Sequence, residues 1–205
     1  MIWMAPLERV RNRQMRPSDH RPPVGSRREV LACLLALGLP AAVAASDPVA
    51  LLRAGGCVLL LRHAATDPGI GDPPGFKLAE CSSQRNLSEV GRSQAQRIGL
   101  WFKQHELAPA AVRTSAWCRC QDTARLAFGQ FQVWSPLNSV FNDRLPLPDQ
   151  TDTLRGALKL VKPGQFEVWV THQVNVSALT QTAPAMGQGV IVDNQGRLLA
   201  QASLG

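Results

Sequence analysis

The stretch GCVLLLRHA, residues 56–64, decides the fold of this chain. Residues 57–61 are all apolar, and the run ends at Arg62 and His63. A short continuous apolar run beside a glycine is typical of a strand that is covered on both faces, as in a parallel sheet. We therefore expect a buried strand over residues 56–61, with Arg62 and His63 at its carboxyl end.

Strand and helix patterns alternate after this run. A helix is expected from Leu87, with Ser88 as its N-cap, and Val90, Ala95, Ile98, Trp101 and Phe102 fall on one of its faces. The patterns predict further helices over residues 118–129 and 152–160, and strands over residues 110–115, 131–134, 166–171, 190–192 and 197–200. This alternation favours an α/β domain, a three-layer α/β/α arrangement around a mostly parallel sheet.

The connection between the first strand and the first helix, residues 65–86, is rich in glycine and proline. A structureless segment of this length inside a compact domain is usually functional or mobile.

The overall composition is that of a globular protein. Apolar residues make up 45% of the chain and charged residues 18%, which excludes disordered, collagen-like and heptad-repeat chains. The net charge of +7 would suggest nucleic-acid binding, but residues 1–30 alone hold seven arginines against three acidic residues. Because the other basic residues are scattered, we expect no nucleic-acid partner.

The first 45 residues have the pattern of a targeting segment. The basic region is followed by residues 30–45, VLACLLALGLPAAVAA, which carry no charge and end in small residues. This is typical of a secretory signal, and it is shorter than the roughly 20 apolar residues of a spanning helix. We expect residues 1–45 to be a removable leader, residues 46–205 to form a periplasmic or secreted domain, and the protein to have no stable membrane span. Arg27 and Arg28 also fit the twin-arginine export motif, which leaves the route open.

Four cysteines follow the leader: Cys57, Cys81, Cys118 and Cys120. An even number in an oxidising compartment permits disulfides, and the spacings do not fit a structural zinc site. We expect Cys57 to be buried in its strand and Cys81 to pair with Cys118 or Cys120, and we expect no metal site.

Three of the predicted strands end in polar residues. Arg62 and His63 follow the first, Ser115 and Arg119 follow the second, and His172 follows the strand at 166–171. Ligands of such sheets bind at the carboxyl ends of the strands. One arginine guanidinium can donate two parallel hydrogen bonds to the oxygens of a phosphate, and neutral imidazole is a competent nucleophile. The sequence therefore indicates phosphoryl chemistry, with Arg85 and Ser115 as further candidate contacts to the substrate.

Four motifs in this order resemble those of the histidine phosphatase superfamily, which includes the phosphoglycerate-mutase-like enzymes. The family's Leu-Arg-His-Gly appears as Leu61 to Ala64, and its Leu-Ser/Thr-x-x-Gly-x-x-Gln-Ala as residues 87–95. Its Ser-x-x-x-Arg-x-x-x-Thr-Ala appears as residues 115–124, and its second strand-end histidine as His172. The motifs cover nearly all of residues 46–205, so the chain looks like a short exported bacterial member with a phosphoglycerate-mutase-like fold.

The resemblance implies a role for each matching residue. His63 would attack phosphorus and become phosphohistidine, while Arg62, Arg119 and His172 hold the phosphoryl oxygens. The substrate would be a small phosphorylated compound, and neither a metal nor another cofactor would be needed because the arginines supply the positive charge. The sequence does not indicate an oligomeric state.

Two positions depart from the family pattern. Ala64 replaces the glycine, and Gln173 stands where the acid-phosphatase branch has an acidic residue. Asp143 and Asp67 are the candidate proton donors for the leaving group, although a good leaving group would need none.

Three functions therefore remain open. The first is an exported phosphomonoesterase, since the loop and cysteine pattern looks similar to envelope sugar phosphatases of this family. The second is a cytoplasmic protein phosphohistidine phosphatase. The third is a catalytically weak phosphate-binding protein.

Overall fold

The computed structural model describes residues 47–143 and 145–204. The predicted leader, residues 1–45, lies outside the described residues, so its removal and the export of the domain stay predictions.

A six-stranded mixed sheet forms the centre of the domain. Its strands are β1 (Cys57–Arg62), β2 (Ala111–Thr114), β3 (Gln132–Val133), β4 (Phe166–Thr171), β5 (Gln188–Asp193) and β6 (Leu198–Ser203). Their spatial order is β3-β2-β4-β1-β5-β6. The pairings among β1 to β4 are parallel, and β5 pairs with β1 and with β6 in antiparallel fashion. The predicted α/β class is confirmed, and β5 and β6 form the predicted hairpin.

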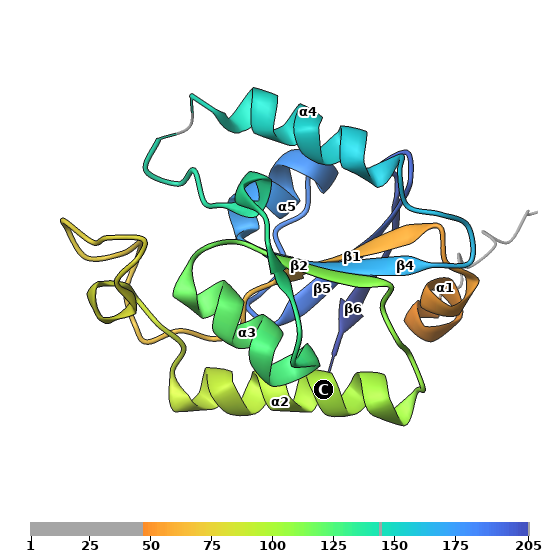
Figure 1. The fold of residues 1–205 in the computed structure, drawn as a ribbon, viewed down its shortest axis with the longest axis horizontal. Helices are drawn as coiled ribbons and strands as arrows, with labels where there is room; N and C mark the ends of the chain where they lie inside the picture. The colour runs from red at the N-terminus through yellow and green to blue at the C-terminus, as the bar shows by residue number, and fades with distance from the viewer. Residues whose placement is uncertain (1–46, 144, 205) are drawn as a thin grey trace, which may run out of the picture. The chain divides into compact units, whose positions relative to one another are not determined.

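Helices cover both faces of the sheet, as predicted. Their bounds are α1 (Pro48–Ala54), α2 (Glu89–Gln104), α3 (Cys118–Phe128), α4 (Leu147–Leu158) and α5 (Gln173–Thr180). In Figure 1, α2 and α3 lie below the sheet and α4 and α5 above it. Within residues 47–143 and 145–204 no helix has the length and apolarity needed to cross a membrane.

The alternation of side chains along β1 builds two cores. Cys57, Leu59 and Leu61 pack into one core with residues of α1, α2 and α3. Val58 and Leu60 pack into the other, with residues of α4 and α5. All five are at most 1% exposed, and burying an aliphatic side chain of this size contributes roughly 1.5–3 kcal/mol. The central position of β1 explains why its sequence is apolar on both faces.

Four details differ from the sequence-based expectations. Val90 is 69% exposed, because Gly91, Ala95, Ile98 and Phe102 form the buried face of α2. Helix α4 begins at Leu147 instead of residue 152, since proline is tolerated in a first turn whose N–H groups have no intrahelical partners. Helices α1 and α5 were not expected. Both are short, and α5 contains β-branched residues that favour strands.

Candidate active site

Adjacent parallel strands bring the two predicted histidines together. Arg62, the last residue of β1, is paired in register with Thr171, the last residue of β4. His63 and His172 therefore leave neighbouring strands at the same edge of the sheet, and their ring centroids are 5.4 Å apart. Both rings are buried, at 3% and 4% exposure.

The hydrogen bonds of His63 fix the tautomer of its ring. Nδ1 lies 2.9 Å from the carbonyl oxygen of Ala64. A carbonyl only accepts, so Nδ1 carries the proton and Nε2 of the neutral ring keeps its lone pair. Nε2 is therefore the nucleophilic atom.

Residues of the sequence motifs hold the backbone around His63. The N–H of His63 donates to Thr171, that of Ala64 to Oγ1 of Thr123, and that of Ala65 to Oε1 of Gln94, at 2.9–3.0 Å. The glycine of the same helix motif, Gly91, allows close packing here, because a Cβ on it would lie 1.8 Å from the Ala65 oxygen. These motif residues orient the nucleophile by fixing the backbone of residues 63–65.

His172 is oriented by Ser115. Oγ of Ser115 lies 2.9 Å from Nε2 of His172 and 3.2 Å from Oδ1 of Asn138, and it accepts the N–H of Trp117. Oδ1 of Asn138 also accepts the N–H of Ala116. The hydroxyl satisfies every partner when it donates to Asn138 and accepts from Nε2–H of His172. Nδ1 of His172 is then the ring nitrogen left for a ligand.

Ser115 thus has a different place from the one predicted. It was expected to bind substrate, but it is fully buried and lies behind His172. The first N–H groups around the start of α3 are also occupied, since those of Ala116, Trp117 and Cys118 donate to Asn138, Ser115 and Gln84.

Three arginines lie around the histidines, and each is held by a hydrogen bond from its Nη1. Nη1 of Arg62 donates to the Pro184 oxygen, Nη1 of Arg85 to the Gly69 oxygen, and Nη1 of Arg119 to Asp72. Within the described part of the chain, Nε of each is buried and has no hydrogen-bond partner. Buried donors without partners are rare in native proteins. In a guanidinium, Nε–H and one Nη2–H point along a common edge, so each arginine presents a donor edge that suits an oxyanion.

Asp72, which no sequence motif indicated, anchors Arg119. Its two oxygens accept from Nη1 and Nη2 of Arg119 at 2.6 and 3.2 Å. They also accept the N–H of Arg85 and Nε1–H of Trp117. The side chains of Asp72 and Arg119 are each 5% exposed. Burial raises the pKa of Asp72, but the hydrogen bonds and charge of Arg119 outweigh this and hold its pKa below the usual value.

Burial and positive charge keep both histidines neutral. Burial is the largest cause that lowers the pKa of His63, to about 3, and Arg119, Arg62 and Arg85 lower it further. The pKa of His172 is also well below its usual value, through burial, then His63 and the same arginines. Burial and the two other guanidinium groups lower the pKa of Arg62 as well. The three guanidinium groups at the base of the site carry more positive charge than the Asp72 carboxylate neutralises.

A cavity of about 590 Å³ opens over these groups. Arg62, His63, Arg85, Arg119 and His172 all line it, so the structure brings five of the predicted residues together. Of the two predicted proton donors, Asp143 lines the cavity and is exposed, whereas Asp67 is not part of its lining. Across the described residues no group of three or more His, Cys, Asp or Glu side chains is arranged to hold a metal ion.

Solved structures with the same fold include TTHB049 from Thermus thermophilus, which is 18% identical. The match covers 72% of this chain and 99% of that one, with a TM-score of 0.52. The protein histidine phosphatase SixA, solved with tungstate, is 15% identical over 72% of this chain and 96% of its own, with a TM-score of 0.50. No curated protein sequence matches the chain significantly.

The sequence profile named "Histidine phosphatase superfamily (branch 1)" matches residues 58–143. Over these residues the chain is similar to the histidine phosphatase superfamily. The matched segment includes Arg62, His63 and Arg119 and ends at Asp143, whereas His172, which lines the same cavity, lies beyond it.

A disulfide links the start of α3, beside this cavity, to the loop that follows β1. Cys81 bonds to Cys118, the first residue of α3, which decides between the two predicted pairings. Oε1 of Gln84 accepts the N–H of Cys118 nearby. Cys57 and Cys120 are buried free thiols, and burial raises the pKa of Cys120 to about 12. The disulfide and Asp72 together fix the loop against the start of α3.

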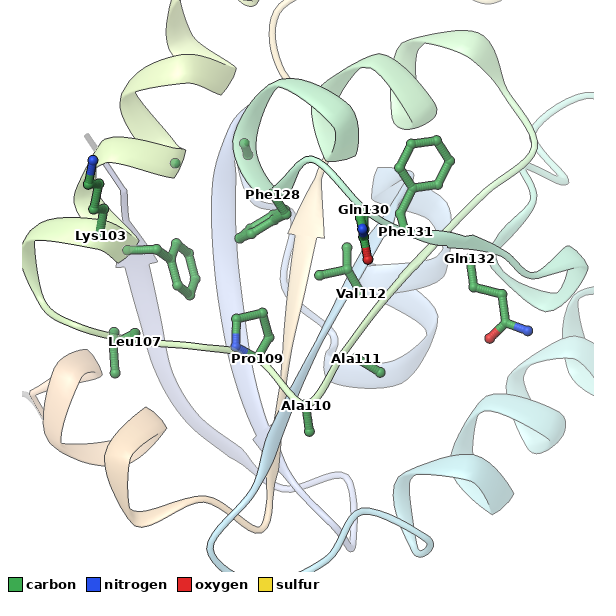
Figure 2. Close-up of a pocket in the computed structure, with 13 residues that line it drawn as sticks. Lys103, Leu107, Pro109, Ala110, Ala111, Val112, Phe128, Gln130, Phe131 and Gln132 are labelled. Carbon is green, nitrogen blue, oxygen red and sulfur yellow. The ribbon is translucent and has the colours of Figure 1, made fainter.

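A second cavity, about 570 Å³, lies at the amino end of β2 and shares no lining residue with the candidate active site. Figure 2 shows Phe128, Pro109 and Val112 on its walls and Lys103 at its side. None of the catalytic candidates lines it.

Proposed function

We propose that this protein is a histidine phosphatase that hydrolyses phosphomonoesters through a phosphohistidine formed on His63, in the bacterial envelope after its leader is removed. The observation that carries the proposal is the set of three anchored arginines around His63, each with a buried Nε that has no hydrogen-bond partner among residues 47–143 and 145–204. Three guanidinium groups line the cavity, and the carboxylate of Asp72 is paired with one of them, Arg119. The excess suits an anion of about two charges, which a phosphate monoester carries near neutral pH.

The first step transfers the phosphoryl group to the enzyme. The lone pair of His63 Nε2 forms a bond to phosphorus as the bond from phosphorus to the ester oxygen breaks, and that oxygen leaves with the electron pair and takes a proton from solvent. The arginine edges stabilise the three equatorial oxygens while charge redistributes over them. Because Nδ1–H of His63 donates to Ala64, positive charge that develops on the ring is shared with that carbonyl.

The second step returns the enzyme to its starting state. Water attacks phosphorus, the bond to Nε2 breaks, and inorganic phosphate leaves. A bound phosphate dianion favours a proton on His172 Nδ1, whose Nε2–H is already held by Ser115. The arginines supply the positive charge for both steps, so we propose that the reaction needs no metal.

The proposal of an envelope location rests on two independent features. Residues 1–45 have the pattern of a secretory signal, and the disulfide between Cys81 and Cys118 is typical of an oxidising compartment. Sequencing the N-terminus of the fractionated protein tests this. A start near residue 46 in the periplasmic fraction supports export, and an intact leader in the cytosol contradicts it.

One observation favours a second candidate, a protein phosphohistidine phosphatase. Of the carboxylates that the structure places on the cavity, Asp72 is paired with Arg119 and Asp143 is exposed near the mouth. The cleavage of a phosphohistidine needs little help from an acid. SixA, which shares the fold, is a protein histidine phosphatase by name.

Hydrolysis of p-nitrophenyl phosphate by the wild type and by His63→Ala tests the main proposal. We expect turnover by the wild type and its loss in the variant, while His105→Gln, at the end of α2, keeps wild-type turnover. Activity that survives His63→Ala contradicts the proposal. Wild-type protein that binds phosphate without turnover supports the phosphate-binding alternative.

A further inference from the structure

The wall of the active-site cavity beyond the arginines and the two histidines is largely apolar. Its side chains come from the loop after β1, the start of α3, the loop before α4 and the start of α5: Ile70, Phe76, Trp117, Val140, Phe141 and Val174. Arg62, Arg85 and Arg119 lie with the two histidines, so the cavity has a cationic base and a hydrophobic wall.

Two of these side chains are strongly exposed. Ile70 is 89% exposed and Phe141 49%. Their loops approach each other, since a Cβ placed on Gly71 would lie 3.9 Å from Cε1 of Phe141. Hydrophobic side chains that gather in this way beside a cavity mark a binding surface.

The aromatic part of the wall has no free polar group. Phe76 and Trp117 form a pair with ring centroids 6.0 Å apart, and the ring centroids of Trp117 and His172 are 5.3 Å apart in a T-shaped arrangement. Nε1–H of Trp117 already donates to Asp72. Trp117 therefore offers ring carbons to a substrate, directly beside the histidine that contacts the phosphate.

Two polar side chains of the loop before α4, Ser139 and Asp143, form hydrogen bonds within that loop. Oγ of Ser139 accepts the N–H of Phe141, and one oxygen of Asp143 accepts the N–H of Leu145. These bonds stabilise the loop itself. Ser139 and Asp143 thus each use one acceptor within the loop, and Asn142 and Gln173 are the other polar side chains of this part of the lining.

From this wall we infer that the substrate is a phosphate monoester of a hydrophobic alcohol or phenol, whose apolar part leaves the cavity between Ile70 and Phe141. The inference rests on the proposed function, because the phosphate must lie against His63 for the leaving group to lie along this wall. It makes Ile70 and Phe141 specificity-determining residues.

A series of 4-alkylphenyl phosphates, from methyl to pentyl, tests the inference. The alkyl group barely changes the basicity of the phenol, so the chemical step stays nearly constant along the series. We expect kcat/KM of the wild type to rise with each methylene, by up to about fourfold where the methylene is fully buried. We expect Ile70→Ser/Phe141→Ser to flatten this rise.

Leu198→Ser provides the matched control, because Leu198 lies on β6 outside the cavity. Its exposed fraction, 44%, is similar to the 49% of Phe141. This variant should keep the wild-type dependence on chain length. A rise that the double variant retains, or that Leu198→Ser also loses, overturns the inference.

Hexyl phosphate and glucose 6-phosphate, both esters of primary alcohols, give a second comparison. We expect the larger kcat/KM for hexyl phosphate, and the reverse order overturns the inference. Wild-type turnover that depends on His63 but not on chain length overturns the inference alone. No turnover of any of these esters overturns the proposed function and the inference together.

Discussion

Asp72 binds Arg119 along one edge of the guanidinium and leaves the other edge free. Its oxygens lie 2.6 and 3.2 Å from Nη1 and Nη2, while Nε of Arg119 is buried and has no partner among the described residues. The carboxylate therefore fixes the orientation of Arg119 without occupying the edge that a phosphate would use. Asp72 is a positioning residue for the proposed reaction.

Loss of the Asp72 carboxylate should affect both stability and catalysis. We expect Asp72→Ala to lower the free energy of unfolding by about 3–5 kcal/mol, because it leaves the buried Arg119 charge uncompensated. We expect kcat/KM to fall by about tenfold or more, since Arg119 loses its orientation. Urea unfolding and steady-state kinetics measure the two effects.

Asp152→Ala is the control, since Asp152 forms an exposed ion pair with Arg155. Such pairs contribute about 0–1 kcal/mol. A stability loss in Asp72→Ala that does not exceed the loss in Asp152→Ala contradicts the positioning role.

The hydroxyl of Ser115 links three groups behind His172. Ser115→Ala removes the partner of His172 Nε2, Trp117 N–H and the Asn138 amide. We expect a loss of about 1–3 kcal/mol in the free energy of unfolding, because buried polar groups lose their partners. We also expect a lower kcat with little change in KM for phosphate esters. Ser203→Ala, at an exposed position on β6, should change neither, and equal behaviour of the two variants would contradict this role.

The disulfide between Cys81 and Cys118 closes a loop of 37 residues. Chain entropy predicts that such a cross-link stabilises the fold by about 4 kcal/mol. We expect dithiothreitol to lower the Tm of the wild type and to leave the Tm of Cys81→Ser/Cys118→Ser unchanged. Thermal unfolding followed by circular dichroism with and without reductant measures this. A wild-type Tm that does not respond to complete reduction would count against it.

The lowered pKa of His63 makes stability depend on pH in one direction. Its pKa is about 3 in the folded state, against about 6.5 in the unfolded chain. Between these values the unfolded state binds more protons, so stability is complete above pH 6.5 and falls as the pH decreases. From pH 7 to pH 5 the loss due to His63 should be about 2 kcal/mol.

Urea unfolding at pH 7 and pH 5 measures this loss. His63→Asn should lose about 2 kcal/mol less than the wild type between the two values. The same loss in both proteins would show that His63 titrates normally in the folded state.

The parts of the fold that were predictable carry a local signal. The apolar run of β1, the Ser88 cap of α2 and the alternating pattern of β4 depend on nearby residues, and each element formed close to its expected bounds. The pairing of His63 with His172 was also predictable, because the carboxyl ends of parallel strands meet at one edge.

The parts that were missed depend on contacts between distant residues. Asp72 lies in a Gly/Pro-rich loop without periodicity, 47 residues before Arg119, so nothing local indicates its role. Ser115 stands at a strand end and was expected to face the substrate. The direction of its side chain is set by Asn138 and His172, which come later in the chain. Helix α5 is short and contains β-branched residues, so it depends on packing against the sheet.

The most direct test of the account is to trap the enzyme with a labelled phosphate ester and identify the modified residue. We expect an acid-labile, alkali-stable phosphoenzyme whose label maps to Nε2 of His63 and is missing in His63→Ala. Label on any other residue, or rapid turnover by the wild type with His63 never modified, would contradict the central claim.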